Sequence, residues 1–268
     1  MNDLTQPRNA RGRWLHAVSQ QRPTMNAPGT KRKENPEKPR KKTKKVKPAQ
    51  LPILTPERLQ TLLLNLKETV CGVDLSLASP SVAVLDPIQK VLHSYVIRQR
   101  KGDLAHNEVR ITEGPMTGWL FRLTCLPEPI VAENTAMYRF ARFMPILDMI
   151  MNAVGNAKTV AIESYAHAVG RFQSSSQSVL IELGAVVRWS LFRQVKRLVE
   201  VPPSQAKRVF TGLGKSTKEE MVECALKTYK LPCVHKLLGI HSDRKTVAKP
   251  VDDVIDAIAV AFCALSSQ

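Results

Sequence analysis

The sequence predicts an α/β protein in which a mixed sheet of about five strands is covered by helices. Three short β-type runs follow one another between residues 70 and 98, which is typical of an antiparallel meander. After residue 134, amphipathic helical patterns alternate with apolar strand patterns, which is typical of parallel strands joined by helices. The chain closes with VDDVIDAIAVAFCALSSQ (251–268), whose apolar residues at helical spacing predict one more buried helix.

The first half of this fold begins with a short helix in TPERLQTLLLNL. Thr55 suits the N-cap, Pro56 suits the first helical position, and leucines recur at helical spacing. Strands are expected at 70–75, 81–85 and 90–98. Residues 100–133 are punctuated by Gly and Pro without a clear period, so we expect an irregular insertion or long connection there.

The second half alternates helices and strands. Helices are expected at 134–155, 174–195 and 217–230, and strands at KTVAIES (158–164) and RLVEVPP (197–203). KTVAIES is almost continuously apolar, as strands buried in parallel sheets are, and RLVEVPP ends at its prolines. In the helix at 134–155, the helical spacing predicts a buried face made of Met137, Phe140, Ala141, Met144, Leu147 and Met151.

The positive charge of the chain is concentrated near its N-terminus. Residues 1–50 carry 14 Lys/Arg against 3 Asp/Glu, and KRKENPEKPRKKTKKVKPAQ (31–50) has no apolar periodicity. Such a stretch buries too little apolar surface to offset its ordering entropy, so we expect a disordered basic arm at 1–50 and one folded domain at 51–268. The arm would attract phosphates without reading sequence, although a solubilising tail, a targeting tail or a nuclear localisation signal would look the same.

The composition also limits the cellular compartments in which we expect the protein. The chain has no apolar run long enough to span a membrane and no hydrophobic signal-peptide core, so we expect no membrane partner and no secretion. Its five cysteines are scattered, mostly within apolar segments, which is typical of a reducing compartment. We expect an intracellular protein in a compartment that holds DNA: a bacterial or viral-host cytoplasm, a nucleus or an organelle.

Two motif-like stretches are weaker than they look. GLGKST (212–217) resembles a nucleotide-binding P-loop, but Val209 stands where that motif needs a glycine, so we expect no nucleotide cofactor. Cys224, Cys233, His235 and His241 do not follow the spacing of a standard zinc site.

The last helix begins with an excess of negative charge. Acids in a first turn complement the helix dipole, which accounts for one or two carboxylates among Asp252, Asp253 and Asp256. Asp253 and Asp256, however, share a face at the edge of the apolar stripe, where an unpaired charge is costly. Residues 251–268 contain no Lys or Arg, so the positive partner must come from elsewhere in the fold or be a metal ion.

Two further carboxylates end predicted strands. Asp74 follows TVCGV and Glu163 follows TVAI, and a carboxylate after a buried strand usually projects at the edge of the sheet where sites form. If the two strands are neighbours and the last helix packs across them, Asp74, Glu163, Asp253 and Asp256 converge. Four such carboxylates require cations, and oxygen ligands favour Mg²⁺ or Mn²⁺. Two such ions are the usual means of hydrolysing a phosphodiester.

Four segments also resemble a known family: CGVDLS (71–76), VAIESYAHA (160–168), VPPSQAKRVFTGLGKSTKEEM (201–221) and VDDVIDAIAVAF (251–262). They are similar to the RuvC family of Holliday-junction resolvases, in the RNase H-like superfamily. The resemblance implies an RNase H-like mixed five-stranded sheet, a three-strand meander plus two parallel strands, flanked by helices. It also implies that Asp74, Glu163, Asp253 and Asp256 are the catalytic residues and hold two Mg²⁺ or Mn²⁺ ions.

The resemblance extends to residues that would contact DNA. Lys207 and Lys218 fall where the family places lysines against the DNA backbone, and Lys215 is an additional candidate beside them. The aromatic that the family wedges into a junction is not cleanly reproduced, and Tyr165 or Phe172 is the candidate substitute.

The function that the sequence favours is a structure-selective endonuclease, a crossover junction endodeoxyribonuclease acting on four-way DNA junctions. Two symmetric nicks call for a twofold homodimer, which we expect the apolar face at 179–192 to support in addition to its own core. Two alternatives remain open: a related nuclease acting on RNA–DNA hybrids, forks or flaps, and a non-catalytic DNA-binding or scaffold protein.

Overall fold

The computed structural model describes residues 51–268 except 78, 99–105, 128–136, 165–174, 195–196, 241–246 and 248. The basic arm expected at 1–50 therefore lies outside the described residues. The helices are α1 (Pro56–Asn65), α2 (Met137–Val154), α3 (Ser175–Gln194), α4 (Pro203–Thr211), α5 (Lys218–Lys227), α6 (Val234–Leu237) and α7 (Val251–Ser266). The strands are β1 (Val70–Asp74), β2 (Ser81–Asp86), β3 (Val91–Arg98), β4 (His106–Arg110), β5 (Leu120–Pro127), β6 (Thr159–Glu163) and β7 (Arg197–Val201).

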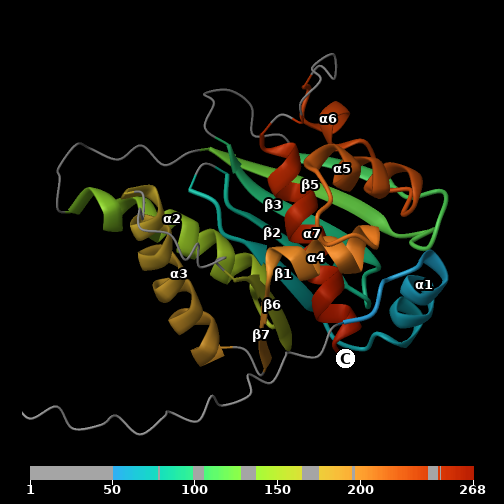
Figure 1. The fold of residues 1–268 in the computed structure, drawn as a ribbon, viewed down its shortest axis with the longest axis horizontal. Coiled ribbons are helices and arrows are strands. Elements are labelled where there is room, and N and C mark those ends of the chain that lie inside the picture. Colours follow the sequence, from blue (N-terminus) through green and yellow to red (C-terminus); the bar gives the residue numbers. More distant parts are fainter. Residues whose placement is uncertain are drawn as a thin grey trace, which may run out of the picture. The chain divides into compact units, whose positions relative to one another are not determined.

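The predicted α/β class is confirmed. In the described part of the chain one mixed sheet has the order β4-β5-β3-β2-β1-β6-β7 (Figure 1). Its central part is the expected arrangement, because β1, β2 and β3 form an antiparallel meander and β1, β6 and β7 pair in parallel. The expected core of five strands, a three-strand meander plus two parallel strands, is thus present.

The expectation that 100–133 is irregular is wrong for the part that the structure describes, residues 106–127. Within it, β4 and β5 pair antiparallel to each other, and β5 adds in parallel to β3, so the sheet has seven strands instead of five. Alternate residues of β5, such as Phe121, Leu123 and Cys125, are buried, which is the pattern of a strand with one face on the core. The intervening turn at 111–119 obscured this period in the sequence.

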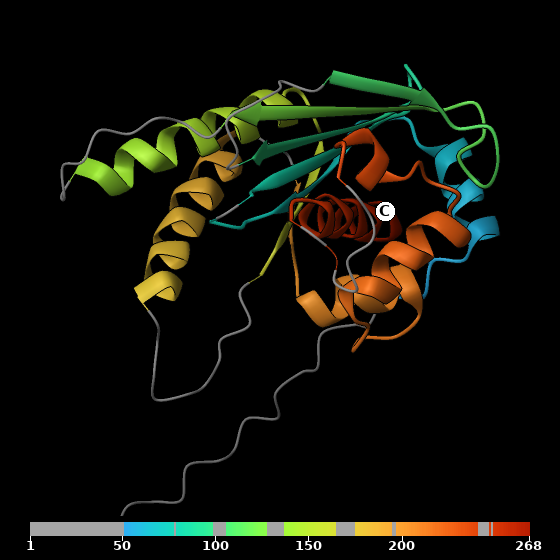
Figure 2. The ribbon, with the colours of Figure 1, turned by 90° about the horizontal axis from the view of Figure 1, so that it is seen from above.

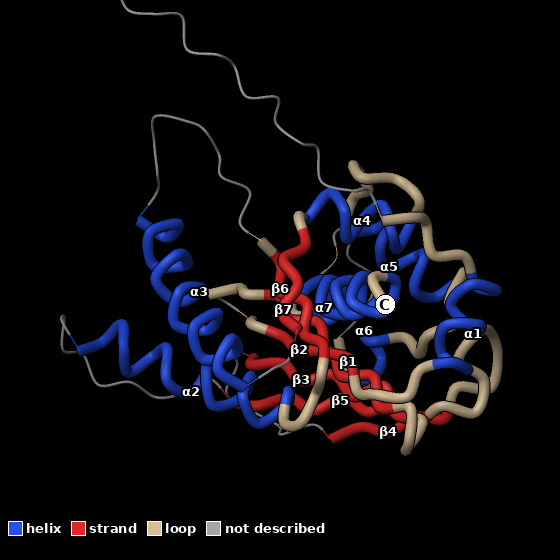
Figure 3. Tube along the Cα trace, turned by 90° about the horizontal axis from the view of Figure 1, so that it is seen from below, coloured by secondary structure: helices blue, strands red, loops and turns tan. Residues whose placement is uncertain are grey.

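The two faces of the sheet are covered by different helices (Figures 2 and 3). One face packs against α7, which is flanked by α4 and α5, and the other carries α2 and α3. Along β1, Val70 belongs to the apolar cluster on the α7 side, whereas Cys71 and Val73 belong to the cluster on the α2 side. Because strand residues alternate between faces, Asp74 points to the α7 side.

The last helix, α7, is buried along almost its whole length. Residues 251–265 are all buried except Asp256, which is partly exposed. The helix lies so close to β1 that a Cβ on Gly72 would stand 2.1 Å from the amide nitrogen of Ala261. Only a glycine permits this approach, so Gly72 sets the distance between β1 and α7.

The buried face predicted for the helix at 134–155 is wrong in part. Ala141 is exposed and Met144 is 50% exposed, whereas Phe143, Ile146 and Ile150 are buried. Relative to the prediction, the helix is rotated about its axis, so that Phe143, Ile146, Met149 and Ile150 are the side chains that face the sheet. The predicted side chains of Met137 and Phe140 lie outside the described residues. No helix in the described ranges combines the length and the apolar composition needed to cross a membrane.

Candidate functional site

The site begins where β1 and β6 end side by side. The two strands pair in parallel with Val73 opposite Ile162, so Asp74 and Glu163 are the next residues on adjacent strands. Ala161 packs on the α7 side and Ile162 on the α2 side, which turns Glu163, like Asp74, toward α7. The two carboxyl groups lie close enough for each to shift the pKa of the other: Glu163 raises that of Asp74, and Asp74 lowers that of Glu163 against the larger raising effect of burial. The expectation that these strands are neighbours is therefore confirmed.

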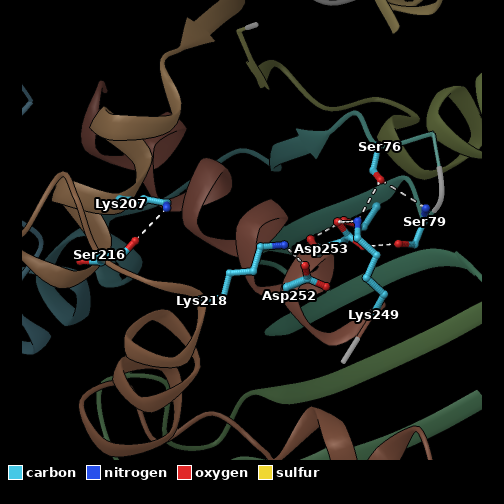
Figure 4. A network of polar contacts seen from close by, with 9 residues as sticks. Ser76, Ser79, Lys207, Ser216, Lys218, Lys249, Asp252 and Asp253 are labelled. Carbon is cyan, nitrogen blue, oxygen red and sulfur yellow. Dashed lines mark hydrogen bonds and ion pairs between the residues drawn. The ribbon is translucent and has the colours of Figure 1, made fainter. Parts of the chain in front are cut away.

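Two serines hold the start of α7 against this edge. The Ser79 hydroxyl donates to a carboxylate oxygen of Asp253, and the Ser81 hydroxyl donates to the Asp253 backbone oxygen. Both serines are buried, and Ser81 is the first residue of β2. These contacts hold the first turn of α7 at the end of β1 and the start of β2, with Ser79 against Asp253 (Figure 4). There the charges of Asp253 and Asp256 act on Asp74.

The electrostatics show that the four carboxylates lie within each other's field. Burial raises the pKa of Asp74 well above its usual value, and Glu163, Asp256 and Asp253 raise it further. Burial likewise raises the pKa of Glu163 and of Asp253. Burial, followed by the Glu163 charge, raises the pKa of Asp256 to about 7. The four carboxyl groups therefore need nearby positive charge in order to ionise.

Part of this positive charge comes from two lysine side chains outside the last helix. Lys249 Nζ donates to both carboxylate oxygens of Asp253, at 2.8 and 3.0 Å, and lies 3.3 Å from Ser76 Oγ. Lys218 Nζ, at the start of α5, pairs with Asp252 (Figure 4). The sequence left open whether the positive partner is a metal ion or another part of the fold, and the structure supplies these two side chains.

Asp252, Lys249, Ser79 and Ser81 were not among the predicted site residues. Asp252 is buried, and its second carboxylate oxygen, Oδ1, has no hydrogen-bond partner in the described part of the chain. One signal was available, because Lys249 is only four residues before Asp253 and lies just ahead of the start of α7. The contacts of Asp252 and of the serines join residues far apart in the chain, so local sequence carried no sign of them.

The three predicted DNA-contacting lysines lie on one segment, α4 to α5. Lys207 Nζ donates to the backbone oxygen of Ser216 at 2.8 Å, and Lys207 and Lys218 both lower the pKa of Glu163 against the larger opposing effect of burial. Lys215 is exposed on the turn between the two helices. The helices α4 and α5 pack on the α7 side of the sheet, which is also the side that carries the carboxylates. Tyr165 and Phe172 lie outside the described residues.

The chemistry of this donor set fits a hard divalent cation. Every candidate ligand is a carboxylate oxygen, and one buried oxygen of Asp252 is unpartnered. Across the described residues, however, no three His, Cys, Asp or Glu side chains form a group that holds one ion as they stand. Both carboxylate oxygens of Asp253 are engaged by Lys249, and one of them also by Ser79. Binding an ion requires these contacts to open.

No protein-family model matches the sequence, and no curated protein does. Among solved structures, similarity is found to RuvC of Thermus thermophilus, at 18% identity and a TM-score of 0.38, over 72% of this chain and 91% of that one. The same protein in complex with a Holliday junction substrate matches at 16% identity and a TM-score of 0.38, over 73% of this chain and 92% of that one. The yeast mitochondrial Holliday junction resolvase Ydc2 matches at 13% identity and a TM-score of 0.43, over 78% of this chain and 84% of that one. These are proteins of the kind that the sequence resembles.

Proposed function

We propose that this chain is a divalent-metal-dependent endonuclease that hydrolyses phosphodiester bonds in branched DNA, with the four-way junction as its preferred substrate. The observation that carries the proposal is the meeting of Asp74, Glu163, Asp253 and Asp256 from two adjacent strand ends and one helix start. A merely structural acidic cluster would be a burden on the fold, because each carboxyl is held where its ionised form is disfavoured.

The proposed catalytic residues Asp74, Glu163, Asp253 and Asp256 would hold Mg²⁺ or Mn²⁺. Two such ions, when bound, supply activation of a water nucleophile and stabilisation of the departing oxygen, leaving a 5′-phosphate and a 3′-hydroxyl. The chain's own residues prepare for this. Asp74, whose pKa is raised by burial and by Glu163, has to be ionised, and the Lys249 ammonium has to move off the Asp253 oxygens.

The lysines are suited to hold the DNA backbone beside the carboxylates. Lys215 is exposed, and the Lys218 side chain is 49% exposed while its ammonium group is paired with Asp252. Lys207 is oriented by its hydrogen bond to Ser216. A phosphate contacted by these side chains would lie next to the carboxylates, which is the arrangement needed for in-line attack.

We infer that the protein acts as a homodimer, with a second copy seated on α3. The residues predicted for this purpose are largely used internally, because Leu183 and Val187 are fully buried against the sheet. The opposite side of α3 instead exposes Ile181 at 41%, Trp189 at 65% and Phe192 at 71%, spaced so that they share one face. A twofold contact between two such helices would bury this apolar face and pair two sites for symmetric nicking.

The proposal is tested by a cleavage panel of synthetic four-way junctions, forks, flaps, RNA–DNA hybrids and linear duplex, each with Mg²⁺ or Mn²⁺. Junctions are expected to be cut fastest. Asp74→Asn is expected to abolish cleavage and leave junction binding nearly unchanged, and Asp148→Asn, which alters an exposed acid on α2, to cut like the natural protein. Preference for hybrids or flaps would identify a related nuclease, and binding without any cutting would identify a scaffold protein.

The same residues can be tested without cleavage. Isothermal calorimetry is expected to detect uptake of Mn²⁺ by the natural protein and by Asp148→Asn, and to detect much weaker uptake by Asp74→Asn. Equal uptake by all three proteins would remove Asp74 from the metal site. For the dimer, Trp189→Glu is expected to convert the protein to a monomer in analytical ultracentrifugation, whereas an unchanged mass would refute the α3 interface.

A further inference from the structure

The first turn of α7 carries a buried acid that is not one of the four proposed catalytic residues. Asp252 is 3% exposed, and its carboxylate oxygen Oδ2 pairs with the ammonium group of Lys218 (Figure 4). Its other oxygen, Oδ1, is buried and has no hydrogen-bond partner among the described residues. Because a buried carboxylate is costly without a positive partner, the contact with Lys218 is important to Asp252.

The Lys218 side chain is held at both of its ends. Lys218 is the first residue of α5, and a capping box fixes the backbone there, because the Thr217 hydroxyl accepts from the Glu220 amide and the Glu220 carboxylate accepts from the Thr217 amide. At the far end of the side chain, Asp252 binds the ammonium group. The side chain is therefore ordered although 49% of it is exposed.

An ordered lysine suits phosphate binding better than a freely moving one. A lysine side chain loses rotamer freedom when it binds a phosphate, and this loss is smaller where the side chain is already held. An ammonium group also has more than one N–H donor, so Lys218 can donate to a phosphate while it stays bound to Asp252. Lys215, by comparison, is exposed on the turn before α5.

The held ammonium group lies beside the proposed catalytic carboxylates. Burial raises the pKa of Glu163 and of Asp256, and Lys218 is among the groups that act in the opposite direction on both. Asp252 and Asp256 are four residues apart on α7, a spacing that places them on one face of the helix. A phosphate bound by Lys218 would therefore lie next to the residues that are proposed to hold the metal ions.

The pair between Asp252 and Lys218 should persist when DNA binds. If Lys218 left for a phosphate, Asp252 would remain buried with neither oxygen bound in the described part of the chain. Separating a buried carboxylate from its cation is strongly disfavoured. A contact that persists fixes where the ammonium group stands, and with it where the phosphate is bound.

We propose that Asp252 is a positioning residue, which holds the Lys218 ammonium group where it binds a DNA phosphate next to the metal site. This inference rests on the proposed function and deepens it, because it gives a role to an acid outside the proposed catalytic set. Asp252 touches neither the DNA nor a metal ion and acts only through Lys218.

The sign of the effect separates positioning from simple electrostatics. Removing a negative charge beside a DNA-binding lysine should, by electrostatics alone, strengthen DNA binding and speed cleavage. Loss of positioning instead slows cleavage and does not weaken binding, because the lysine remains present but no longer holds the phosphate in the reactive position. The two effects of changing Asp252 are thus opposite in the cleavage rate.

The test measures binding and cleavage of a four-way junction separately in Asp252→Asn, which keeps the shape of the side chain and removes its charge. Binding is measured with Ca²⁺ in place of Mg²⁺ to prevent cleavage, and we expect Kd to be unchanged or lower. We expect the single-turnover rate with Mg²⁺, at saturating protein, to fall about tenfold. Asp252→Ala, which introduces no new donor, repeats the measurement if the Asn variant does not fold.

The control is Glu223→Gln, which breaks the pair between Glu223 and Lys227 elsewhere on α5 and is expected to bind and cut like the natural protein. Calorimetric uptake of Mn²⁺ by Asp252→Asn is expected to stay within about twofold of the natural value. Much weaker uptake would make Asp252 a metal ligand and would overturn the inference.

A double-mutant cycle tests whether Asp252 acts through Lys218. Lys218→Gln removes the charge that binds phosphate but keeps an amide donor for the buried Asp252 carboxylate, so we expect it to fold. Adding Asp252→Asn to Lys218→Gln is expected to lower the cleavage rate by less than about twofold, because the lysine that Asp252 holds is already absent. A further tenfold loss would show that Asp252 acts independently of Lys218 and would refute the positioning role.

The remaining outcomes separate the inference from the proposed function. If the natural protein cuts junctions and Asp252→Asn cuts them equally fast or faster, the positioning role is refuted and the proposed function stands. If the natural protein cuts no DNA with Mg²⁺ or Mn²⁺, the proposed function is refuted and the positioning role with it.

Discussion

Replacing Gly72 by alanine tests the close approach on which the geometry of the site depends. The added Cβ would stand 2.1 Å from Ala261 N, 2.3 Å from Ala257 O and 2.7 Å from Ala261 Cα, all backbone atoms of α7. Ordinary contacts begin at about 3.4 Å, so the helix has to move away from β1 by roughly 1.3 Å. Because α7 is buried on all sides, no neighbouring space is free to receive it.

The expected cost follows from this displacement. Overpacking a core by one methyl group costs about 1–3 kcal/mol and more where backbone must move, so we expect Gly72→Ala to lower the free energy of unfolding by about 3 kcal/mol or more. Asp253 and Asp256 would move with α7 relative to Asp74 and Glu163. A misplacement of about 1 Å costs roughly 100-fold in rate, so any folded fraction should cleave at least that much more slowly.

Urea unfolding followed by circular dichroism measures the first effect and junction cleavage the second. Gly239→Ala is the control, since Gly239 has a left-handed φ of 62° but open space around it, and we expect it to lower the free energy of unfolding by only about 1–2 kcal/mol. Adding Ala261→Gly to Gly72→Ala should not rescue stability, because the atoms in conflict are backbone atoms. A Gly72→Ala protein within about 0.5 kcal/mol of the natural one would refute the reasoning.

Three further predictions concern charge. Because the pKa of Asp256 is raised to about 7, the folded protein keeps a proton that the unfolded chain releases, so without divalent ions stability should fall as pH rises from about 4 to about 7. Asp256→Asn should flatten this slope in urea unfolding at several pH values, and an unchanged slope would contradict it. Lys249→Gln should raise the calorimetric affinity for Mn²⁺ about tenfold, unlike Lys227→Gln, which breaks a remote pair with the same spacing. Deleting residues 1–48 should weaken DNA binding and reduce its salt slope by about 0.9 for each phosphate that the arm neutralises, and an unchanged slope would exclude the arm from binding.

Sequence reasoning located the elements whose signals are local. The helix at Pro56 is capped by Thr55 as predicted, and α5 begins with a full capping box between Thr217 and Glu220. The strand that ends at Asp74 and the strand that ends at Glu163 were recognisable because apolar residues run up to each carboxylate. These patterns depend on residues that are close together in the chain, so a single sequence was enough to predict them.

The seven-stranded sheet was harder to predict from the sequence. The strand β5 alternates buried and partly buried residues, but its partners β3 and β4 could not be identified from that alternation alone. The parallel pairing of β3 with β5 joins Val91 to Leu120 across the intervening chain. Pairing of this kind is decided by which register buries most apolar surface in the complete fold, so the segment looked irregular in the sequence.

By itself, the sequence determined the α/β class, the order of most elements and the four carboxylates at strand ends and a helix start, because each depends on local periodicity. Only the tertiary structure decided which side chains contact the acids at the start of α7, namely Lys249 and Ser79 on Asp253 and Lys218 on Asp252. It also decided which face of α3 is exposed around Trp189. Asp253 and Ser79 are 174 residues apart, and such contacts arise only when packing has fixed how α7 lies against β1. Burial then raises the pKa of Asp74 and of Asp253, because a charge in the protein interior is costly.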